Sequence, residues 1–380
     1  MSSPPSLPSP ESLARARDLH ARAFVMDAHV DTLSEMCDRN YHLGNAPPNA
    51  HLSWEHIQTG GLNAQLFACF VPVRMIPDAC RAHVDKLADR FEEEVARFPD
   101  RLAACRSAAD IRAAHAGGKF AGMLSIEGGH AIEDSLENLA HFHARGIRAM
   151  TLTWNNTNNW ADGCGPMDKS LKQHGGLTDF GRQVVATMES LGIAVDISHV
   201  AVSTYWDVLE CATRSPFASH SSCKAIHDHR RNLTDDQLRA MADHGGVVGI
   251  CFCSGFLIDE SVVWAKVKQT PEYAAVGEKT EMTDFAGISP EEYAVYNRHV
   301  PLARLGDAVA HVDHALRVMG TQGVALGTDF DGASRFPVGL EHLGKLPALT
   351  AGLLDRGWKE DELEGMLGAN LLDYFSRVIG

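Results

Sequence analysis

Short apolar runs alternate with amphipathic stretches along most of this chain. Eight of the runs have the length of a buried strand, and most are followed by a stretch with helical periodicity. The eight runs are residues 24–27, 64–71, 121–126, 148–153, 193–197, 216–219, 247–252 and 324–326. Strands that alternate with helices build parallel sheets through right-handed crossovers. We therefore expect an α/β fold, and a count of eight favours a (β/α)8 TIM-type barrel.

Residues at the predicted helix boundaries support this alternation. Thr178 is a candidate N-cap for the stretch that ends at Leu191-Gly192, and Thr234 with Gln237 forms a capping-box pattern. No G-x-G-x-x-G motif follows the first apolar run, although that motif marks the open sheets that bind dinucleotides. A closed barrel is therefore favoured over an open, doubly wound sheet.

Two regions do not follow the alternation. Residues 1–20 begin with a run rich in serine and proline that lacks the basic start and apolar core of a secretory signal, and we expect a flexible tail. Residues 254–300 are acidic and dotted with aromatic residues, without clean periodicity. We expect residues 21–380 to form a single barrel domain with an insertion at about 254–300. A lid or substrate loop is favoured there over a dimer contact.

Composition and charge narrow the choice of partners. The 380 residues carry a formal net charge of −15, which argues against nucleic acid or an anionic membrane surface as a partner. No apolar run approaches the length of a membrane span. The nine cysteines form no CxxC pair, and several lie within apolar runs. Reduced thiols in a cytoplasmic protein fit this pattern best.

The candidate chemistry begins with a His-x-Asp pair directly after the first apolar run. Alternate residues of a strand face the same side, so His29 and Asp31 would project together from the end of the first strand. An imidazole beside a carboxylate suits a divalent metal such as zinc. Alone, the pair is a weak signal, because the chain has 20 histidines.

Four later apolar runs end in the same way. The ligand-type residues at their ends are Glu127, His199, His220 and Asp329. The carboxyl ends of barrel strands meet at one face, where active sites lie, so these residues would share a mouth with His29 and Asp31. Three histidines and three carboxylates exceed the needs of one tetrahedral zinc. They suit two metals about 3.5–4 Å apart, bridged by a carboxylate and a water, with one Asp left to move protons.

The ordered motifs resemble those of the membrane (renal) dipeptidase family of binuclear zinc metallopeptidases, a branch of the amidohydrolase-type barrels. The resemblance covers the chain from Asp27 to Gly380. The motifs that carry it are Asp27-Ala28-His29-Val30-Asp31, Ser125-Ile126-Glu127-Gly128-Gly129-His130, Gly176-Leu177-Thr178, Val195-Asp196-Ile197-Ser198-His199-Val200, Ser219-His220-Ser221-Ser222, Arg230-Arg231-Asn232 and Gly327-Thr328-Asp329-Phe330-Asp331-Gly332.

By this resemblance, five residues are expected to hold two Zn²⁺ ions per subunit. His29 and Asp31 would bind one ion, His199 and His220 would bind the other, and Glu127 would bridge the two. Cobalt and manganese suit similar ligands, so the sequence leaves the native metal open. The partner implied is a small dipeptide substrate, and a homodimer is common in the family.

The resemblance also implies the residues that act on the substrate. Asp329 would carry a proton between the attacking water and the leaving amine. Arg231 would fix the substrate, because its planar fork can grip a carboxylate or an oxyanion. Trp154 stands where the family usually has a histidine near the substrate carbonyl, and Phe256 stands where it has a tyrosine. Because an indole donates one hydrogen bond, stabilisation of the transition state would rest more on the metals or on the two asparagines after Trp154.

We therefore predict a dizinc dipeptidase that hydrolyses dipeptides by attack of a metal-bridging hydroxide and, as its family does, accepts a C-terminal D-residue. Trp154, Phe256 and the insertion motivate an alternative, a binuclear metal amidohydrolase that acts on another small amide or ester such as an N-acyl amino acid or a lactone. A third hypothesis is a binding protein that kept the barrel and lost its activity at the Trp154 position.

Overall fold

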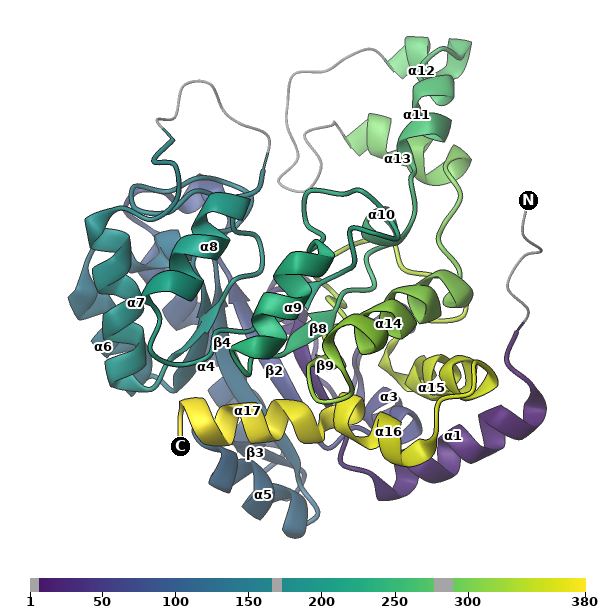
Figure 1. Ribbon diagram of the computed structural model, residues 1–380, viewed down its shortest axis with the longest axis horizontal. Helices are drawn as coiled ribbons and strands as arrows, with labels where there is room; N and C mark the ends of the chain where they lie inside the picture. Colours follow the sequence, from purple (N-terminus) through teal and green to yellow (C-terminus); the bar gives the residue numbers. More distant parts are fainter. Residues whose placement is uncertain (1–6, 166–172, 277–289) are drawn as a thin grey trace.

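The computed structural model describes residues 7–165, 173–276 and 290–380, and Figure 1 shows its ribbon. Within these residues, nine parallel strands form one sheet. The strands are β1 (Met26–Val30), β2 (Ala64–Phe70), β3 (Leu102–Ala104), β4 (Phe120–Glu127), β5 (Ile147–Thr151), β6 (Ala194–Asp196), β7 (Ala218–Ser221), β8 (Val248–Ile250) and β9 (Val324–Leu326). Eight strands follow the order β6-β5-β4-β2-β1-β9-β8-β7, and β3 pairs with the first residues of β4.

The two end strands of this order meet, so that the sheet closes on itself. The amide of Phe217, directly before β7, donates to the carbonyl of Val195 in β6 at 3.0 Å, and the amide of Ile197 donates to the carbonyl of Phe217 at 2.8 Å. This parallel contact completes a barrel. The predicted (β/α)8 barrel is confirmed, and each of the eight predicted apolar runs overlaps one of its strands.

Helices cover the outside of the barrel, and α17 crosses below it in Figure 1. The α-helices are α1 (Pro10–Arg22), α2 (Thr32–Arg39), α3 (Trp54–Gly60), α4 (Cys80–Arg97), α5 (Ala108–Ala116), α6 (Leu136–Ala144), α7 (Asp179–Leu191), α8 (Val202–Cys211), α9 (Asp235–Asp243), α10 (Ser254–Leu257), α11 (Ser261–Val267), α12 (Pro271–Val276), α13 (Pro290–His299), α14 (Leu305–Met319), α15 (Leu346–Asp355), α16 (Glu360–Glu364) and α17 (Asn370–Val378). The shorter turns are η1 (Val73–Met75), η2 (Gly129–Ile132), η3 (Leu343–Lys345) and η4 (Gly365–Ala369). None of the helices in the described ranges is both long enough and apolar enough to cross a bilayer.

The longest strand pair, β2 and β4, positions Glu127 at the carboxyl end of the barrel. β2 and β4 run side by side from Ala64 opposite Ala121 to Phe70 opposite Glu127, and every residue of both strands is buried. Strands buried on both faces are apolar throughout, which is why the charged Glu127 at the end of β4 stands out. Gly122 allows α4 to pack closely, because a Cβ there would lie 2.6 Å from the Phe91 ring.

The N-terminal region differs from the flexible tail expected over residues 1–20. Ser9 caps α1, and Pro10 occupies its first turn, which are both favourable starts for a helix. Leu19 is fully buried, because one face of α1 packs against α15. The expectation is therefore wrong for residues 10–20, whereas residues 1–6 lie outside the described residues.

The described part of the predicted insertion is helical. Helices α11, α12 and α13 share a small apolar cluster formed by Val267, Tyr273, Val295 and Val300. In Figure 1 these helices extend beyond the body of the barrel. Residues 277–289 of the predicted insertion lie outside the described residues. The choice between a substrate loop and a dimer contact depends on what the described helices contact.

Candidate metal centre

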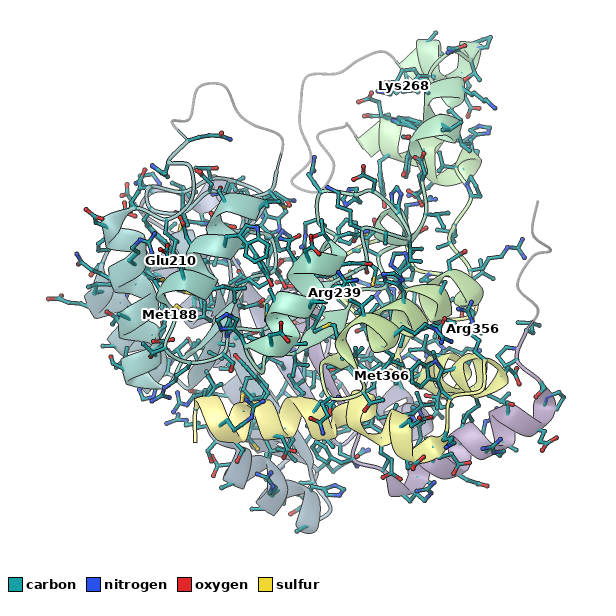
Figure 2. The ribbon with its side chains drawn as sticks, viewed as in Figure 1. Met188, Glu210, Arg239, Lys268, Arg356 and Met366 are labelled. Carbon is teal, nitrogen blue, oxygen red and sulfur yellow. The ribbon has the colours of Figure 1, made fainter. Side chains whose placement is uncertain are left out.

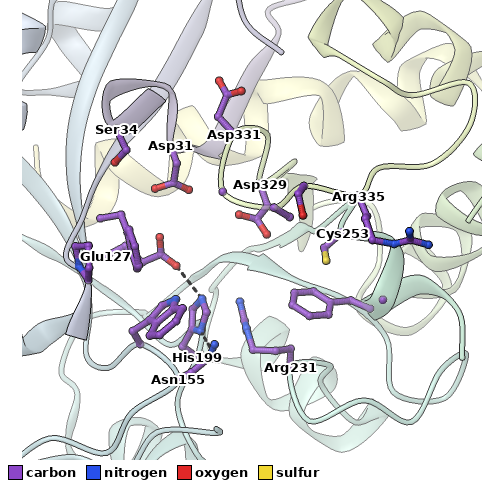
Figure 3. Close-up of a pocket in the computed structure, with 18 of the residues that line it drawn as sticks. Asp31, Ser34, Glu127, Asn155, His199, Arg231, Cys253, Asp329, Asp331 and Arg335 are labelled. Carbon is purple, nitrogen blue, oxygen red and sulfur yellow. Dashed lines mark hydrogen bonds and ion pairs between the residues drawn. The ribbon is translucent and has the colours of Figure 1, made fainter. Parts of the chain in front are cut away.

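Six side chains singled out from the sequence meet at the carboxyl end of the barrel. They are His29 in β1, Asp31 directly after it, Glu127 at the end of β4, His199 after β6, His220 in β7 and Asp329 after β9. All six are buried, with at most 7% of their surface exposed. Figure 3 shows Asp31, Glu127, His199 and Asp329 around one space. The parallel direction of the strands explains this convergence.

The carboxylate of Glu127 lies between the imidazoles and faces a different group with each oxygen. Its Oε1 is 2.8 Å from His199 Nε2 and 3.4 Å from His220 Nε2. Its Oε2 is 3.3 Å from His29 Nε2. His29 Nε2 is in turn 3.2 Å from Asp31 Oδ2. One carboxylate therefore joins two groups of ligand-type atoms, as a ligand that bridges two cations does.

Hydrogen bonds on the far side of two imidazoles determine which nitrogen faces Glu127. His199 Nδ1 donates to Asn155 Oδ1 at 3.0 Å, since an amide oxygen can only accept. His220 Nδ1 lies 2.8 Å from Ser219 Oγ. The Nε2 atoms of the two histidines are 2.9 Å apart. With both Nδ1 atoms protonated, the Nε2 lone pairs converge, which is the state of metal-bound histidines.

Burial and neighbouring charges set the protonation of these groups. Burial, together with the charge of Arg231, lowers the pKa of His199 to about 3. Burial, together with His29, holds the pKa of His220 well below its ordinary value. On the other side of Glu127, burial opposes protonation of His29, yet Glu127 and Asp31 raise its pKa well above the ordinary value. The centre thus offers neutral lone pairs on one side and favours a positive charge on the other.

The donor set fits divalent cations. Each of the two groups that share Glu127 supplies three ligand-type atoms within 4.8 Å of one another; the groups are His29, Asp31 and Glu127, and Glu127, His199 and His220. Imidazole nitrogen and carboxylate oxygen are the donors that zinc takes. Asp31 Oδ1 is buried and has no hydrogen-bond partner among the described residues. A buried carboxylate oxygen left in this state is costly, and a cation would satisfy it.

Asp329 reaches the centre from a strained turn. The φ angles are +63° at Asp329 and +65° at Asp331, in a region that residues with side chains seldom adopt. Gly332 completes the turn, because a Cβ there would lie 2.2 Å from Asp31 Oδ2 and 2.3 Å from Asp329 Oδ1. Burial raises the pKa of Asp329 to about 6, while His29 opposes that rise. A carboxyl group with such a pKa can take up and release a proton near neutral pH.

Two further carboxylates near the centre position the backbone. Asp196 Oδ1 accepts the amide of Ser198 at 2.9 Å and the amide of Ser219 at 3.0 Å, and thereby ties the ends of β6 and β7 together. Asp331 Oδ1 accepts from His51 Nδ1 at 2.6 Å. Both carboxylates therefore hold the loops that carry the ligand-type residues.

A cavity of about 450 Å³ opens beside the centre, a volume within the range of small-molecule sites. Arg231, which lines it, is 3% exposed. Its Nη2 donates to the carbonyl of His220 at 2.9 Å, whereas its Nε is buried without a partner among the described residues. Figure 3 shows the Arg231 side chain extending toward the space between His199 and Asp329. The guanidinium is therefore anchored on β7 while the Arg231 side chain lines the cavity.

The two positions that depart from the family pattern both present aromatic surface to this cavity. The Trp154 ring lies 5.3 Å from the Phe70 ring and 6.1 Å from the His199 ring, centroid to centroid. The guanidinium of Arg231 lies 5.3 Å from the centroid of Phe256. Trp154 and Phe256 both line the cavity, so the substrate site is more apolar than the resemblance alone implies.

Sequence reasoning missed the residues that orient the ligands. Asn155, expected near the transition state, has its Oδ1 against His199. Ser219 and Gly332 each lie inside a recognised motif, directly before His220 and at the end of the 327–332 stretch, so their positions offered a signal. Asn155 and His199 are separated by 44 residues, and no local pattern links them.

A closed parallel barrel with buried imidazole and carboxylate groups at its active-site face is the architecture of a barrel metalloenzyme. Comparison with known families narrows this class. The chain belongs to the membrane dipeptidase family (peptidase family M19), whose family model matches residues 13–379. The family resemblance expected from the motifs is thereby confirmed.

Individual relatives agree with this family. The chain is 31% identical over 338 residues to dipeptidase aclJ of Aspergillus oryzae, an alignment that spans 87% of this chain and 69% of that protein. Two further curated relatives are longer, and the chain spans 57% and 58% of their length.

Solved structures share the fold. The probable dipeptidase PvdM of Pseudomonas aeruginosa gives a TM-score of 0.85 at 23% identity, over 97% of this chain and 99% of that one. A metallopeptidase of Rhodobacter sphaeroides, liganded with a phosphinate mimic of the dipeptide L-Ala-D-Ala, gives a TM-score of 0.76 at 24% identity, over 94% of this chain and 99% of that one.

Proposed function

We propose that this protein is a dizinc dipeptidase that hydrolyses dipeptides, including those with a C-terminal D-residue. The observation that carries the proposal is the position of Glu127, whose two oxygens face two groups of buried ligand-type atoms at the edge of a substrate-sized cavity. Membership of the membrane dipeptidase family supports a peptide bond as the target. The L-Ala-D-Ala mimic bound by the Rhodobacter sphaeroides relative supports the D-residue.

In this proposal His29 and Asp31 would hold one zinc ion, His199 and His220 would hold the other, and Glu127 would be shared between them. The two ions, when bound, lower the pKa of a water molecule and polarise the substrate carbonyl. The protein keeps the five ligands in place through the strand ends and through the hydrogen bonds of the imidazole Nδ1 atoms.

Arg231 and Asp329 act on the substrate. Arg231 binds the C-terminal carboxylate of the dipeptide from the wall of the cavity, while its Nη2 stays on the carbonyl of His220. The oxygen of water bonds to the peptide carbon, the carbon–nitrogen bond breaks, and the proton passes through the carboxylate of Asp329 to the leaving amine. The raised pKa of Asp329, about 6, suits a group that first accepts and then returns a proton.

Trp154 and Phe256 favour a second candidate function. Each places an aromatic ring in the cavity at a position where the family resemblance implies a polar group. An N-acyl amino acid or a lactone would offer apolar surface to these rings without a free amine. The second candidate keeps both metals and the proton transfer through Asp329.

One substrate panel separates the two candidates. Zinc-loaded protein is assayed with L-Ala-L-Ala, L-Ala-D-Ala, N-acetyl-alanine and a small lactone. The proposal predicts turnover of both dipeptides and little turnover of the other two compounds. Turnover of the N-acyl amino acid or the lactone, with none of either dipeptide, would replace the proposal with the second candidate.

A cytoplasmic location belongs to the same proposal. All nine cysteines are free, and five of them are buried, which suits a reducing compartment. The homodimer implied by the resemblance stays a prediction.

A further inference from the structure

The side of the cavity formed by the insertion is lined by aromatic rings. Phe256 of α10, Trp264 of α11, and Tyr293 and Tyr296 of α13 all line the cavity, and we call these four residues the aromatic wall. Each is only partly buried, so part of each ring remains uncovered by protein. Partly exposed aromatic rings around one cavity present the surface that a bulky apolar group of a ligand covers.

A buried ion pair holds the aromatic wall in one arrangement. Arg335 Nη2 lies 3.4 Å from Glu260 Oε1, and both side chains are less than 9% exposed. The Arg335 guanidinium lies 4.6 Å from the centroid of Tyr296, and the Tyr296 hydroxyl donates to Glu260 Oε2. Trp264 packs edge-on against Tyr296 with centroids 4.9 Å apart. The wall is therefore formed before a ligand arrives, which reduces the entropy lost on binding.

The same contacts tie the aromatic wall to the catalytic face of the barrel. Arg335 lies in the loop after β9, which also carries Asp329. The Tyr293 hydroxyl is hydrogen-bonded to Ser334 Oγ in this loop. In Figure 3, Arg335 and Asp329 lie on neighbouring parts of the cavity rim. Helices α10, α11 and α13 therefore form a fixed side of the cavity.

Arg231 relates the aromatic wall to the substrate. Its guanidinium lies against Phe256, the member of the wall next to the metal centre. A dipeptide whose carboxylate is held by Arg231 has its C-terminal Cα one bond from that carboxylate. With the scissile bond beside Glu127, the aromatic wall next to Arg231 is the surface available to the C-terminal side chain.

We infer that the aromatic wall is the subsite for the side chain of the C-terminal residue and that it selects a bulky apolar side chain there. This inference rests on the proposed dipeptidase function and names its substrate class. An aromatic or long aliphatic side chain would cover the exposed faces of Trp264, Tyr293 and Phe256, whereas a methyl group would leave them in water.

The experiment compares Ala-Phe with Ala-Ala as substrates of zinc-loaded protein. Wild type is expected to show a higher kcat/KM for Ala-Phe, and Trp264→Ala and Tyr293→Ala are each expected to lower the ratio of the two values about tenfold, mainly through KM. Trp264 packs near the apolar cluster of the insertion, so Tyr293→Ala provides the second variant if the first loosens α11. Lys268→Ala is the matched control. The Lys268 Nζ lies 5.4 Å from the centroid of the Trp264 ring, but Lys268 is located away from the barrel (Figure 2). The control should keep the wild-type ratio.

The results that would overturn the subsite differ from those that would overturn the proposed dipeptidase function. Equal kcat/KM values for the two dipeptides in wild type, or an unchanged ratio in both wall variants, would overturn the subsite. A preference for Phe-Ala over Ala-Phe that both wall variants abolish would also overturn it, by assigning the wall to the N-terminal residue.

Binding of phosphinate analogues of Ala-Ala and Ala-Phe, measured by calorimetry, provides the separate readout. Tighter binding of the Ala-Phe analogue, reduced by both wall substitutions, supports the subsite even if neither dipeptide is hydrolysed, in which case the dipeptidase proposal alone fails. Equal affinity for the two analogues contradicts the subsite whatever the turnover.

Discussion

At the scale of single residues, the candidate metal centre depends on one carboxylate that faces two groups of ligand-type atoms. Glu127 uses both carboxylate oxygens, one toward His199 and His220 and one toward His29. Burial works against charge on Glu127, yet His29 and the hydrogen bonds of the other two imidazoles hold its pKa well below the ordinary value. A permanently ionised carboxylate in this position suits a bridge between two cations and would be a poor proton carrier. We therefore propose Asp329, and not Glu127, as the proton carrier.

The variant Asp329→Asn separates metal binding from catalysis. The amide has nearly the shape of the carboxylate but cannot accept the proton of the attacking water, so kcat for a dipeptide should fall by roughly 10²- to 10⁴-fold. The five proposed ligands are untouched, so the zinc content should remain at the wild-type level. Steady-state kinetics and metal analysis of the same preparation measure both quantities.

Asp228→Asn is the matched control, because the Asp228 side chain is 84% exposed and its substitution should leave turnover unchanged. Turnover at the wild-type rate in Asp329→Asn would remove Asp329 from the mechanism. Loss of zinc from that variant would instead make Asp329 a ligand.

At the scale of secondary structure elements, α1 is held to the barrel by a buried neutral histidine. His20 Nδ1 donates to the carbonyl of Gly60 in α3 at 2.7 Å, and His20 Nε2 accepts from Thr350 Oγ1 in α15 at 2.8 Å. Burial lowers the pKa of His20 to about 4, although the hydrogen bond with Gly60 opposes this shift. The neutral ring therefore joins three helices that are far apart in the sequence.

Because of His20, the free energy of unfolding is expected to fall as the pH falls. Its pKa is about 4 in the folded chain and 6.5 for the ordinary group, so below pH 6.5 the unfolded chain binds the proton more readily. The stabilisation is complete above pH 6.5 and is lost as the pH falls toward 4, by about 3 kcal/mol in total. His20→Gln should remove that part of the pH dependence of the free energy of unfolding, measured by urea denaturation at pH 7 and pH 4.5.

The exposed His244 supplies the control, and His244→Gln should keep the wild-type pH dependence. An identical loss of stability on acidification in wild type and His20→Gln would show that His20 does not stabilise the docked helix in this way.

The elements that the sequence predicts are those with a long or repeated pattern. The eight barrel strands are apolar runs bounded by polar residues, and this pattern follows from burial on both faces. β3 was missed because only the first of its residues Leu102–Ala104 is buried, so the strand lacks the apolar run of a strand covered on both faces. Helix α1 was missed although Ser9 and Pro10 are good starting signals, because the serine- and proline-rich residues before it dominated the composition.

At the scale of the whole molecule, the barrel explains why distant residues could be assigned to one site. Parallel strands bring their carboxyl ends to one face, so the strand-end positions of His29 and Asp329 predict proximity across 300 residues of sequence. Contacts between loops follow no such rule. The positions of Asn155 against His199 and of Arg335 against Glu260 depend on how loops pack over the mouth, and the sequence carries no periodic signal for that packing.

We propose that one mouth of the barrel seats two divalent cations between five ligands. The most direct test is the zinc content of the purified chain after equilibration with zinc and removal of free metal, measured by inductively coupled plasma mass spectrometry and compared with Glu127→Gln. We expect two zinc ions per wild-type chain and fewer in the variant, because a neutral amide cannot replace the bridging carboxylate. A wild-type chain that retains one ion or none, or a Glu127→Gln variant that still retains two, would contradict it.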